Sequence, residues 1–362
     1  MSEQQTEKKA IDIKKLLKSV LAFKSSDLHL VVGSEPQIRI DKELRPLNLP
    51  VLDAKDIESM AYSLLEDKQK KVFEEYNELD FSFELSGIGR FRANYYKTIY
   101  GIGCAFRMIP IDIPTLDEYG NPPIFKELIK REKGLILVTG PTGSGKSTTL
   151  ASMLHEINLT ERKHILTVED PVEFVHTNIK SLFSQRDVGT STQSFAAALK
   201  YALRQDPDII LIGEMRDAET IGAALTAAET GHLVFGTLHT NSAPSTINRI
   251  IDVFTGEEQA QIRAQLASSL VAVVSQSLIP KIGGGKVATQ EILITNPAIS
   301  NLVREDKVHQ IYSQMQLNQA ETGMTTQTQQ MLELLQKKKI TKENAIKNSN
   351  KPEELQKMID HL

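Results

Sequence analysis

The sequence predicts a mixed α/β protein of two domains, and three observations indicate this class. From residue 134 to residue 238, short apolar runs typical of buried strands alternate with helical segments, which is the pattern of a mostly parallel sheet. A glycine-rich turn lies between the first of these strands and the next helix. Before residue 109 the pattern differs, because amphipathic helices accompany short alternating strands. We therefore expect a small α+β domain followed by a larger α/β domain.

The small domain is expected to span residues 1–108, with its helices packed on an antiparallel sheet. The first nine residues are polar and lack the apolar region of a signal peptide. Apolar periodicity places helices at 11–21 and 53–78, and strands at 28–32, 37–40, 81–85, 90–96 and 103–108.

Residues 109–123 are expected to form an irregular linker, because four prolines and Gly120 interrupt any regular pattern. The second domain is expected to span residues 124–362. Its strands are expected at 134–139, 164–168, 208–213 and 232–238, and its helices at 147–157, 193–204 and 217–229. From about residue 258 the chain is expected to be mainly helical, apart from a glycine triplet and one strand at 290–295.

Composition excludes several classes of function. The 362-residue chain has a formal net charge of −4, so no basic field indicates nucleic acid or anionic lipid as a partner. Its one cysteine, Cys104, excludes a disulfide framework and a cysteine-rich zinc site. No stretch approaches the ~20 apolar residues that a membrane-spanning helix needs. We expect a cytoplasmic or membrane-peripheral protein.

The glycine-rich turn fills the pattern GxxxxGK[ST] and predicts a bound nucleoside triphosphate. Gly143 and Gly145 let the backbone curl so that its N–H groups face a polyphosphate, and Lys146 places a positive charge near the β- and γ-phosphates. The Ser147 hydroxyl is available to Mg²⁺, and the helix that follows directs its positive end at the same phosphates. A turn without a ligand is the alternative, which the complete motif between a strand and a helix disfavours. The predicted phosphate-loop residues are Gly140, Pro141, Thr142, Gly143, Ser144, Gly145, Lys146, Ser147 and Thr148.

Carboxylates follow two later strands and favour hydrolysis over binding alone. In the run 167–174, an acid could orient or deprotonate water against the γ-phosphate, although solvated carboxylates in a turn are the alternative. The apolar run 209–212 is followed by Gly213 and Glu214, in the manner of a Walker B strand. Because Gly213 occupies the place of the usual aspartate, Glu214 alone is expected to reach Mg²⁺.

Two histidines, His232 and His239, bracket the strand at 232–238. Seven residues along a strand separate them by more than about 20 Å, so they are not expected to share a metal. From spacing alone, a structural role is favoured for at least one of them.

Taken together, these segments resemble the secretion-type hexameric ATPases, and most closely the retraction motors of type IV pili. The resemblance extends from Ser26 to Asn344, and its most specific motifs are the phosphate loop, 169–174, 213–217 and 226–241. It implies a PAS-like N-terminal domain and a RecA-like ATPase domain with a helical C-terminal part. By the same resemblance, Glu173 is the catalytic glutamate, Glu214 the Walker B acid, and His232 and His239 nucleotide-linked residues.

The resemblance also implies arginines that approach the nucleotide, which correspond to Arg90, Arg92, Arg107 and Arg204. For each of them, a place on a solvated surface is the alternative. The chain departs from the family pattern at three places: Lys200 where an arginine is expected, Ser300 in the run 298–305, and Thr289-Gln290 where Ala-His is expected.

The implied function is that of a homohexameric motor that hydrolyses ATP with Mg²⁺ and powers pilus retraction. It would act at the cytoplasmic face of the bacterial inner membrane on a platform protein in that membrane, without entering the membrane or binding nucleic acid. An accessory retraction ATPase, a pilus extension or type II secretion ATPase, a nucleic-acid translocase with a RecA-like core and a nucleotide-binding protein without turnover are the alternatives. Extension and secretion ATPases usually have an extra N-terminal region and a four-cysteine zinc site; because this sequence has a single cysteine and only a short stretch before the linker, we expect a retraction motor.

Overall fold

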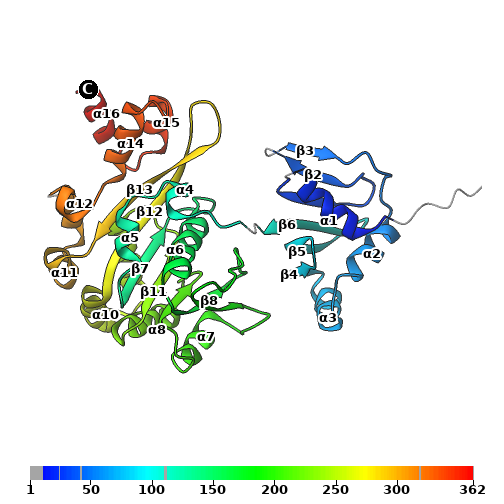
Figure 1. Ribbon diagram of the computed structural model, residues 1–362, viewed down its shortest axis with the longest axis horizontal. Coiled ribbons are helices and arrows are strands. Elements are labelled where there is room, and N and C mark those ends of the chain that lie inside the picture. Colours follow the sequence, from blue (N-terminus) through cyan, green and yellow to red (C-terminus); the bar gives the residue numbers. More distant parts are fainter. Residues whose placement is uncertain (1–10, 24, 41–42, 110–111, 318, 362) are drawn as a thin grey trace, which may run out of the picture. The chain divides into compact units, whose positions relative to one another are not determined.

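The computed structural model describes residues 11–23, 25–40, 43–109, 112–317 and 319–361. It divides into two compact units, residues 1–112 and residues 113–362 (Figure 1). The expected polar N-terminal segment and Pro110 of the expected linker lie outside the described residues. The mixed α/β class predicted from the sequence is confirmed.

The N-terminal unit is a six-stranded antiparallel sheet in the order β3-β2-β1-β6-β5-β4, accompanied by three helices. Along β5, Phe91, Ala93 and Tyr95 are buried, whereas the residues between them are only half-buried, as the period of a strand requires. The bounds are α1 Ile13–Ala22, β1 Asp27–Leu30, β2 Gln37–Ile40, β3 Glu43–Pro46, α2 Ala54–Tyr62, α3 Asp67–Tyr76, β4 Glu78–Leu85, β5 Gly89–Thr98 and β6 Gly101–Ile109.

An aromatic cluster forms the centre of this unit's core. The rings of Phe73 and Phe106 lie edge-on to that of Tyr95, at centroid distances of 6.0 and 5.8 Å. Cys104, the chain's one cysteine, is fully buried on β6, and burial raises the pKa of its thiol. This thiol therefore stays protonated and shielded.

The second unit contains a seven-stranded sheet in the order β13-β12-β7-β11-β10-β8-β9, in which only β13 runs antiparallel to its neighbour. The bounds are α4 Leu116–Tyr119, α5 Ile124–Leu128, β7 Gly134–Thr139, α6 Lys146–Thr160, β8 His164–Glu169, β9 Leu182–Asp187, α7 Phe195–Ala202, β10 Ile209–Ile212, α8 Ala218–Glu229, β11 Leu233–Leu238, α9 Ala243–Asp252, α10 Gly256–Ser269, β12 Leu270–Pro280 and β13 Lys286–Ile294.

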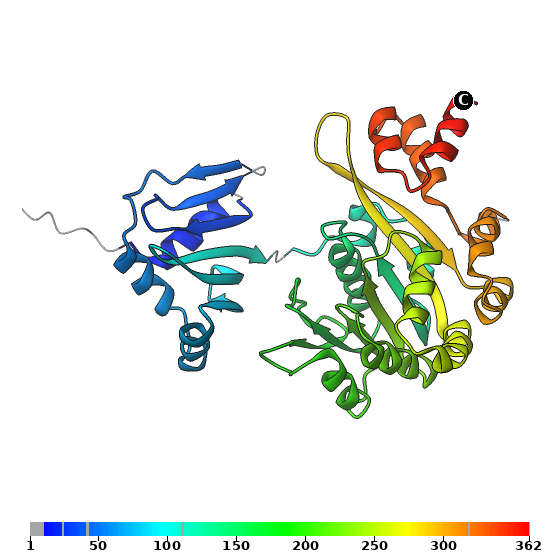
Figure 2. The same cartoon turned by 180° about the vertical axis from the view of Figure 1, so that it is seen from behind.

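Both faces of this sheet are covered by helices, which explains the continuous apolar runs of its strands. Leu135 and Leu137 of β7 pack with α8, α9 and α10, whereas Ile136 and Val138 pack on the other face with α6. Figures 1 and 2 show these two layers of helices from opposite sides. Every residue of β7 is buried, so the turn that follows it begins from a rigid strand at the centre of the sheet.

The expectation of a mainly helical chain from residue 258 is wrong for residues 270–280. These residues form β12, which pairs with β7 on one side and with β13 on the other. The hairpin β12–β13 then packs through Ile279 on the last three helices (Figure 1). The remaining helices are α11 Pro297–Arg304, η1 Val308–Gln310, α12 Ile311–Met315, α13 Gln319–Thr322, α14 Gln327–Gln336, α15 Lys342–Asn348 and α16 Pro352–Asp360.

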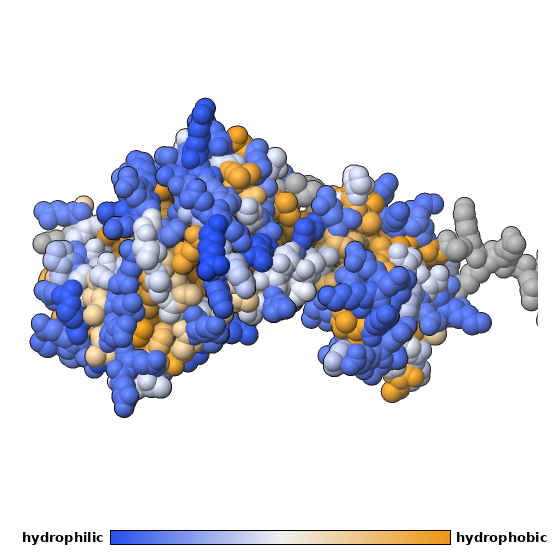
Figure 3. Space-filling view, turned by 90° about the horizontal axis from the view of Figure 1, so that it is seen from below, coloured by the Kyte–Doolittle hydropathy of each residue, from blue (hydrophilic) through white to orange (hydrophobic). Residues whose placement is uncertain are grey.

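The surface is largely hydrophilic on the face shown in Figure 3, where hydrophobic residues form separate patches. Within the part of the chain that the structure describes, no helix has both the length and the apolar character needed to cross a membrane.

Candidate active site

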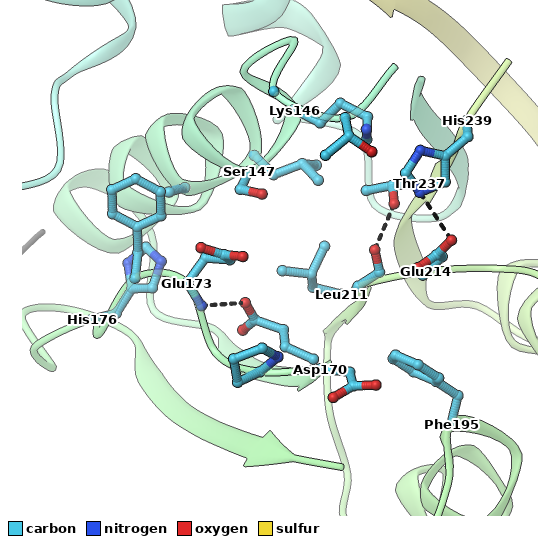
Figure 4. Close-up of a pocket in the computed structure, with 18 residues that line it drawn as sticks. Lys146, Ser147, Asp170, Glu173, His176, Phe195, Leu211, Glu214, Thr237 and His239 are labelled. Atoms are coloured by element: carbon cyan, nitrogen blue, oxygen red, sulfur yellow. Dashed lines mark hydrogen bonds and ion pairs between the residues drawn. The ribbon is translucent and has the colours of Figure 1, made fainter. Parts of the chain in front are cut away.

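A pocket of about 220 Å³ lies where β7, β8, β10 and β11 end (Figure 4). Parallel strands bring their carboxyl ends to the same edge of a sheet, which is where open α/β sheets bind ligands. The pocket therefore collects residues that are far apart in the sequence. Its polar lining includes Thr142, Lys146, Ser147, Glu169, Asp170, Glu173, Glu214, Thr237 and His239.

The phosphate loop connects β7 to the 15-residue helix α6. Gly145, the residue before α6, has a φ of 89°, a conformation that residues with a side chain rarely adopt. Lys146 donates hydrogen bonds from Nζ to the carbonyl oxygens of Gly140 and Pro141, at 2.8 and 3.2 Å. Burial lowers the pKa of Lys146, and the nearby Glu214 carboxylate opposes this effect. The loop and the first turn of α6 thus present backbone N–H groups and a cation to one pocket.

Buried amides of the β12–β13 hairpin support the phosphate loop from behind. Gln276 donates to the carbonyl oxygen of Ser144 at 2.8 Å and accepts from the Thr149 hydroxyl at 2.8 Å. Gln290, which stands where the family pattern has histidine, donates to Gln276 at 2.9 Å and to Asn121 at 2.9 Å. No local sequence pattern marks these glutamines as site residues, because Ser144, Thr149 and Asn121 lie more than a hundred positions away from the glutamines that they contact.

Replacing Gln276 by alanine should weaken nucleotide binding, because the Ser144 carbonyl and the Thr149 hydroxyl would lose a buried partner. Each such loss costs about 1–3 kcal/mol of unfolding free energy. We expect a lower melting temperature and a higher Kd for ATP, measured by thermal unfolding and by titration with a fluorescent nucleotide. Gln261→Ala, which alters an exposed glutamine of α10, is the control. An unchanged Kd in Gln276→Ala would show that the support is dispensable.

Two glutamates at the end of β8 occupy different environments. Glu169 is only 8% exposed, accepts a hydrogen bond from the Thr167 hydroxyl at 2.7 Å, and accepts the backbone N–H of Glu173 at 3.2 Å. Burial raises the pKa of Glu169 to about 7. The Glu173 side chain is exposed, and Figure 4 shows its carboxylate projecting into the pocket towards Ser147. Glu169, which was not among the predicted site residues, thus fixes the backbone that presents Glu173.

Glu214 lies at the opposite side of the pocket (Figure 4). Its Oε1 lies 2.9 Å from Nε2 of His239 and also forms an ion pair with Arg216. A side chain on the residue before it would crowd β8, because a Cβ on Gly213 would lie 3.1 Å from the Cα of Glu169. This close approach of β10 to β8 explains why glycine stands where a Walker B aspartate is usual.

The structure brings together Lys146, Ser147, Glu173, Glu214 and His239, but it does not bring every predicted residue to this pocket. His232 directly precedes β11 and so lies at the amino-terminal ends of the parallel strands, whereas the pocket lies at their carboxyl ends. Its Nδ1 lies 3.0 Å from the carbonyl oxygen of Ala227. Arg204 is exposed in the turn after α7.

The three remaining predicted arginines belong to the N-terminal unit, where each has a polar partner. Arg107 forms an ion pair with Asp27 at 2.8 Å, and Arg92 lies 3.9 Å from Asp80. Arg90 donates to the Ser82 hydroxyl at 3.0 Å. These three side chains lie on β5 and β6 of the N-terminal sheet, in a different unit from the one that contains the pocket.

The donor set of the pocket fits Mg²⁺. Ser147 offers a hydroxyl and Glu214 a carboxylate, which are the hard oxygen ligands that Mg²⁺ prefers. Among the described residues, no group of three or more His, Cys, Asp and Glu side chains could hold a metal ion. Mg²⁺ usually binds through one or two protein ligands together with substrate phosphates, and Ser147 and Glu214 both line this pocket.

Comparisons with known proteins show the family to which this chain belongs. Residues 2–360 match the family model described as type II/IV secretion system protein. The chain is 52% identical over 343 residues to the type IV pilus retractation ATPase PilT of Pseudomonas aeruginosa, covering 95% of this chain and 99% of that protein. It is 50% identical over 321 residues to a twitching motility protein of Neisseria gonorrhoeae, covering 88% and 86%.

A solved structure has the same fold. The crystal structure of the pilus retraction motor PilT with bound ADP superposes with a TM-score of 0.91 at 47% identity, covering 96% of this chain and 100% of that one. The fold expected from the resemblance, a mixed α/β ATPase fold, is confirmed.

Proposed function

We propose, from the geometry of the pocket, a mechanism by which this chain hydrolyses ATP. The chain belongs to the family of type II/IV secretion system proteins. The chain is an ATPase, and it powers type IV pilus retraction. The observation that best supports the mechanism is the meeting of two acids, Glu173 and Glu214, with Lys146 and Ser147 in one pocket.

In this mechanism, different residues of the pocket bind the phosphates and the metal ion and activate the attacking water. Lys146 and the backbone amides of the phosphate loop would hold the β- and γ-phosphates, and Ser147 and Glu214 would hold Mg²⁺, which would neutralise the charge that develops on the phosphate oxygens. Glu173 orients a water molecule and accepts its proton as the water oxygen attacks the γ-phosphorus; the bond from that phosphorus to the β,γ-bridging oxygen breaks, and ADP leaves with the electron pair. His239, which contacts Glu214, responds to the occupancy of the metal and phosphate site.

Arginines would complete the transition state. Hydrolysis spreads negative charge over the γ-phosphate oxygens, and guanidinium groups stabilise such charge better than any other side chain. We propose Arg90, Arg92 and Arg107 for this role, and closure of the N-terminal unit about residues 109–123. Each of the three would then exchange its present partner on the N-terminal sheet for a phosphate oxygen. For Arg204 and His232 the resemblance implies nucleotide-linked roles, which stay predictions because neither residue lines the pocket.

We further propose that six copies form a ring at the cytoplasmic face of the bacterial inner membrane. There the ring would act on a platform protein of the pilus machinery, with ATP as its nucleotide and Mg²⁺ as its metal. This proposal is supported by the family of the chain and by its similarity to pilus retraction and twitching motility proteins.

Measurement of ATP turnover tests the proposal. The full chain should release phosphate from ATP only with Mg²⁺ present, and added single-stranded or duplex DNA should leave the rate unchanged. Strong stimulation by DNA would indicate a nucleic-acid translocase instead. Nucleotide binding without phosphate release would indicate a nucleotide-gated binding protein.

A further inference from the structure

The loop that follows His239 is short and held at its far end. His239 lines the pocket, and α9 begins four residues later at Ala243. Ser242 caps α9 by accepting the Ser245 amide, and Thr246 donates to the Ser242 carbonyl at 2.7 Å. Only residues 240–242 separate His239 from α9, and three residues span a short distance. The position of the first turn of α9 therefore limits where His239 can lie.

Glu291 of β13 fixes that first turn. Its side chain is 2% exposed, and its Oε1 accepts the backbone N–H of Ala243 at 2.8 Å. The same carboxylate accepts the backbone N–H of Gln327, the first residue of α14. One buried carboxylate therefore satisfies unpaired amides of two helices, and both helix N-termini favour negative charge.

A second contact joins the same loop to the C-terminal helices. Asn350 donates from Nδ2 to the carbonyl oxygen of Asn241 at 2.6 Å, and its backbone N–H donates to Gln327 at 2.8 Å. A cavity of about 600 Å³ lies between these contacts, with His239 and Glu291 both in its wall. His239 therefore separates the hydrolytic pocket from a cavity bounded by the C-terminal part.

We propose that Glu291 is a positioning residue for ATP hydrolysis: it fixes the start of α9, sets the approach of His239 to Glu214, and connects this loop to α14. The inference rests on the proposed role of His239. Glu291 does not line the hydrolytic pocket. It therefore acts indirectly, through its hydrogen bond to Ala243 and the backbone of residues 240–243.

A double-mutant cycle in the full chain tests the proposal. Glu291→Ala should lower kcat about tenfold while KM for ATP changes little, since partners that orient a metal-site residue typically contribute about 10–100-fold to activity. His239→Ala should also lower kcat, and the double variant should lose no more than the larger single loss. Glu291→Gln, which keeps an acceptor oxygen for Ala243, should restore most of the rate.

A matched control separates positioning from stability. Thr341→Ala removes the side-chain cap of α15, and Thr341 lines neither the hydrolytic pocket nor the neighbouring cavity. It should lower the melting temperature without changing kcat. If Glu291→Ala does not fold, the cycle is made with Glu291→Gln, whose smaller loss should again vanish in the His239→Ala background.

Three results would overturn the inference: a parental kcat in Glu291→Ala, additive losses in the double variant, or a parental kcat in His239→Ala. A parental kcat in His239→Ala would mean that His239 does not contribute to turnover, so that positioning it could not be the role of Glu291. None of the three affects the proposed hydrolytic mechanism at Glu173, whose failure would appear as full turnover in Glu173→Gln.

Discussion

Replacing Glu173 by glutamine should lower kcat for ATP hydrolysis about 10²–10⁴-fold, the contribution typical of a positioned general base. Glutamine keeps the shape of the side chain but accepts no proton from water. Nucleotide binding should persist, because the phosphate loop and Lys146 are unchanged. Phosphate release under single-turnover conditions measures the first effect, and titration with a fluorescent nucleotide measures the second.

The control for this prediction is Glu219→Gln, which removes an exposed carboxylate from the first turn of α8, outside the pocket. It should hydrolyse ATP at the parental rate. Parental turnover in Glu173→Gln itself would disprove the assignment and leave Glu169, whose pKa of about 7 suits a proton acceptor, as the next carboxyl to examine.

Glu214→Ala should lower turnover about a hundredfold and raise the Mg²⁺ concentration needed for half-maximal activity, because losing a group that orients a bound metal typically costs about 10–100-fold. The substitution also frees His239 and Arg216 from their shared partner. Turnover measured across a Mg²⁺ series distinguishes a weakened metal site from a general loss of folding.

In that series, excess Mg²⁺ should partly restore Glu214→Ala but should not restore Glu173→Gln. An identical Mg²⁺ dependence in the parent and in Glu214→Ala would exclude Glu214 as a ligand or orienting group. Glu219→Ala serves as the matched exposed control.

The centre of the second sheet could be predicted from sequence because its strands are buried on both faces. β7 was expected at residues 134–139, which are its observed bounds, and β8, β10 and β11 lie within one residue of expectation at each end. Continuous apolar runs leave few alternatives at such positions.

Strands in other environments were missed for physical reasons. β12 follows α10 without a glycine or proline between them, so its apolar residues resembled a continuation of the helix. Two edge strands, β3 and β9, are exposed or only partly buried, and therefore lack an apolar run. The sequence therefore predicts a strand that is buried on both faces of a sheet more reliably than a strand that lies at the edge of a sheet.

The candidate site was predictable to the extent that its residues follow strands. Glu173, Glu214 and His239 each come soon after the end of a parallel strand, so the topology gathers them. The residues that support them, Gln276 and Glu291, lie within strands and contact backbone groups of distant loops. Such contacts have no local sequence signal.

The burial of Cys104 has a practical consequence for observing the motor at work. Because the chain's one thiol is fully buried and its pKa is raised, thiol-reactive dyes should leave the native protein unlabelled. A cysteine introduced at Ile282, which is 54% exposed at the tip of the β12–β13 hairpin, would then be the single reactive position. A dye there would report the motion of the hairpin whose base supports the phosphate loop, on a chain that needs no prior removal of native cysteines.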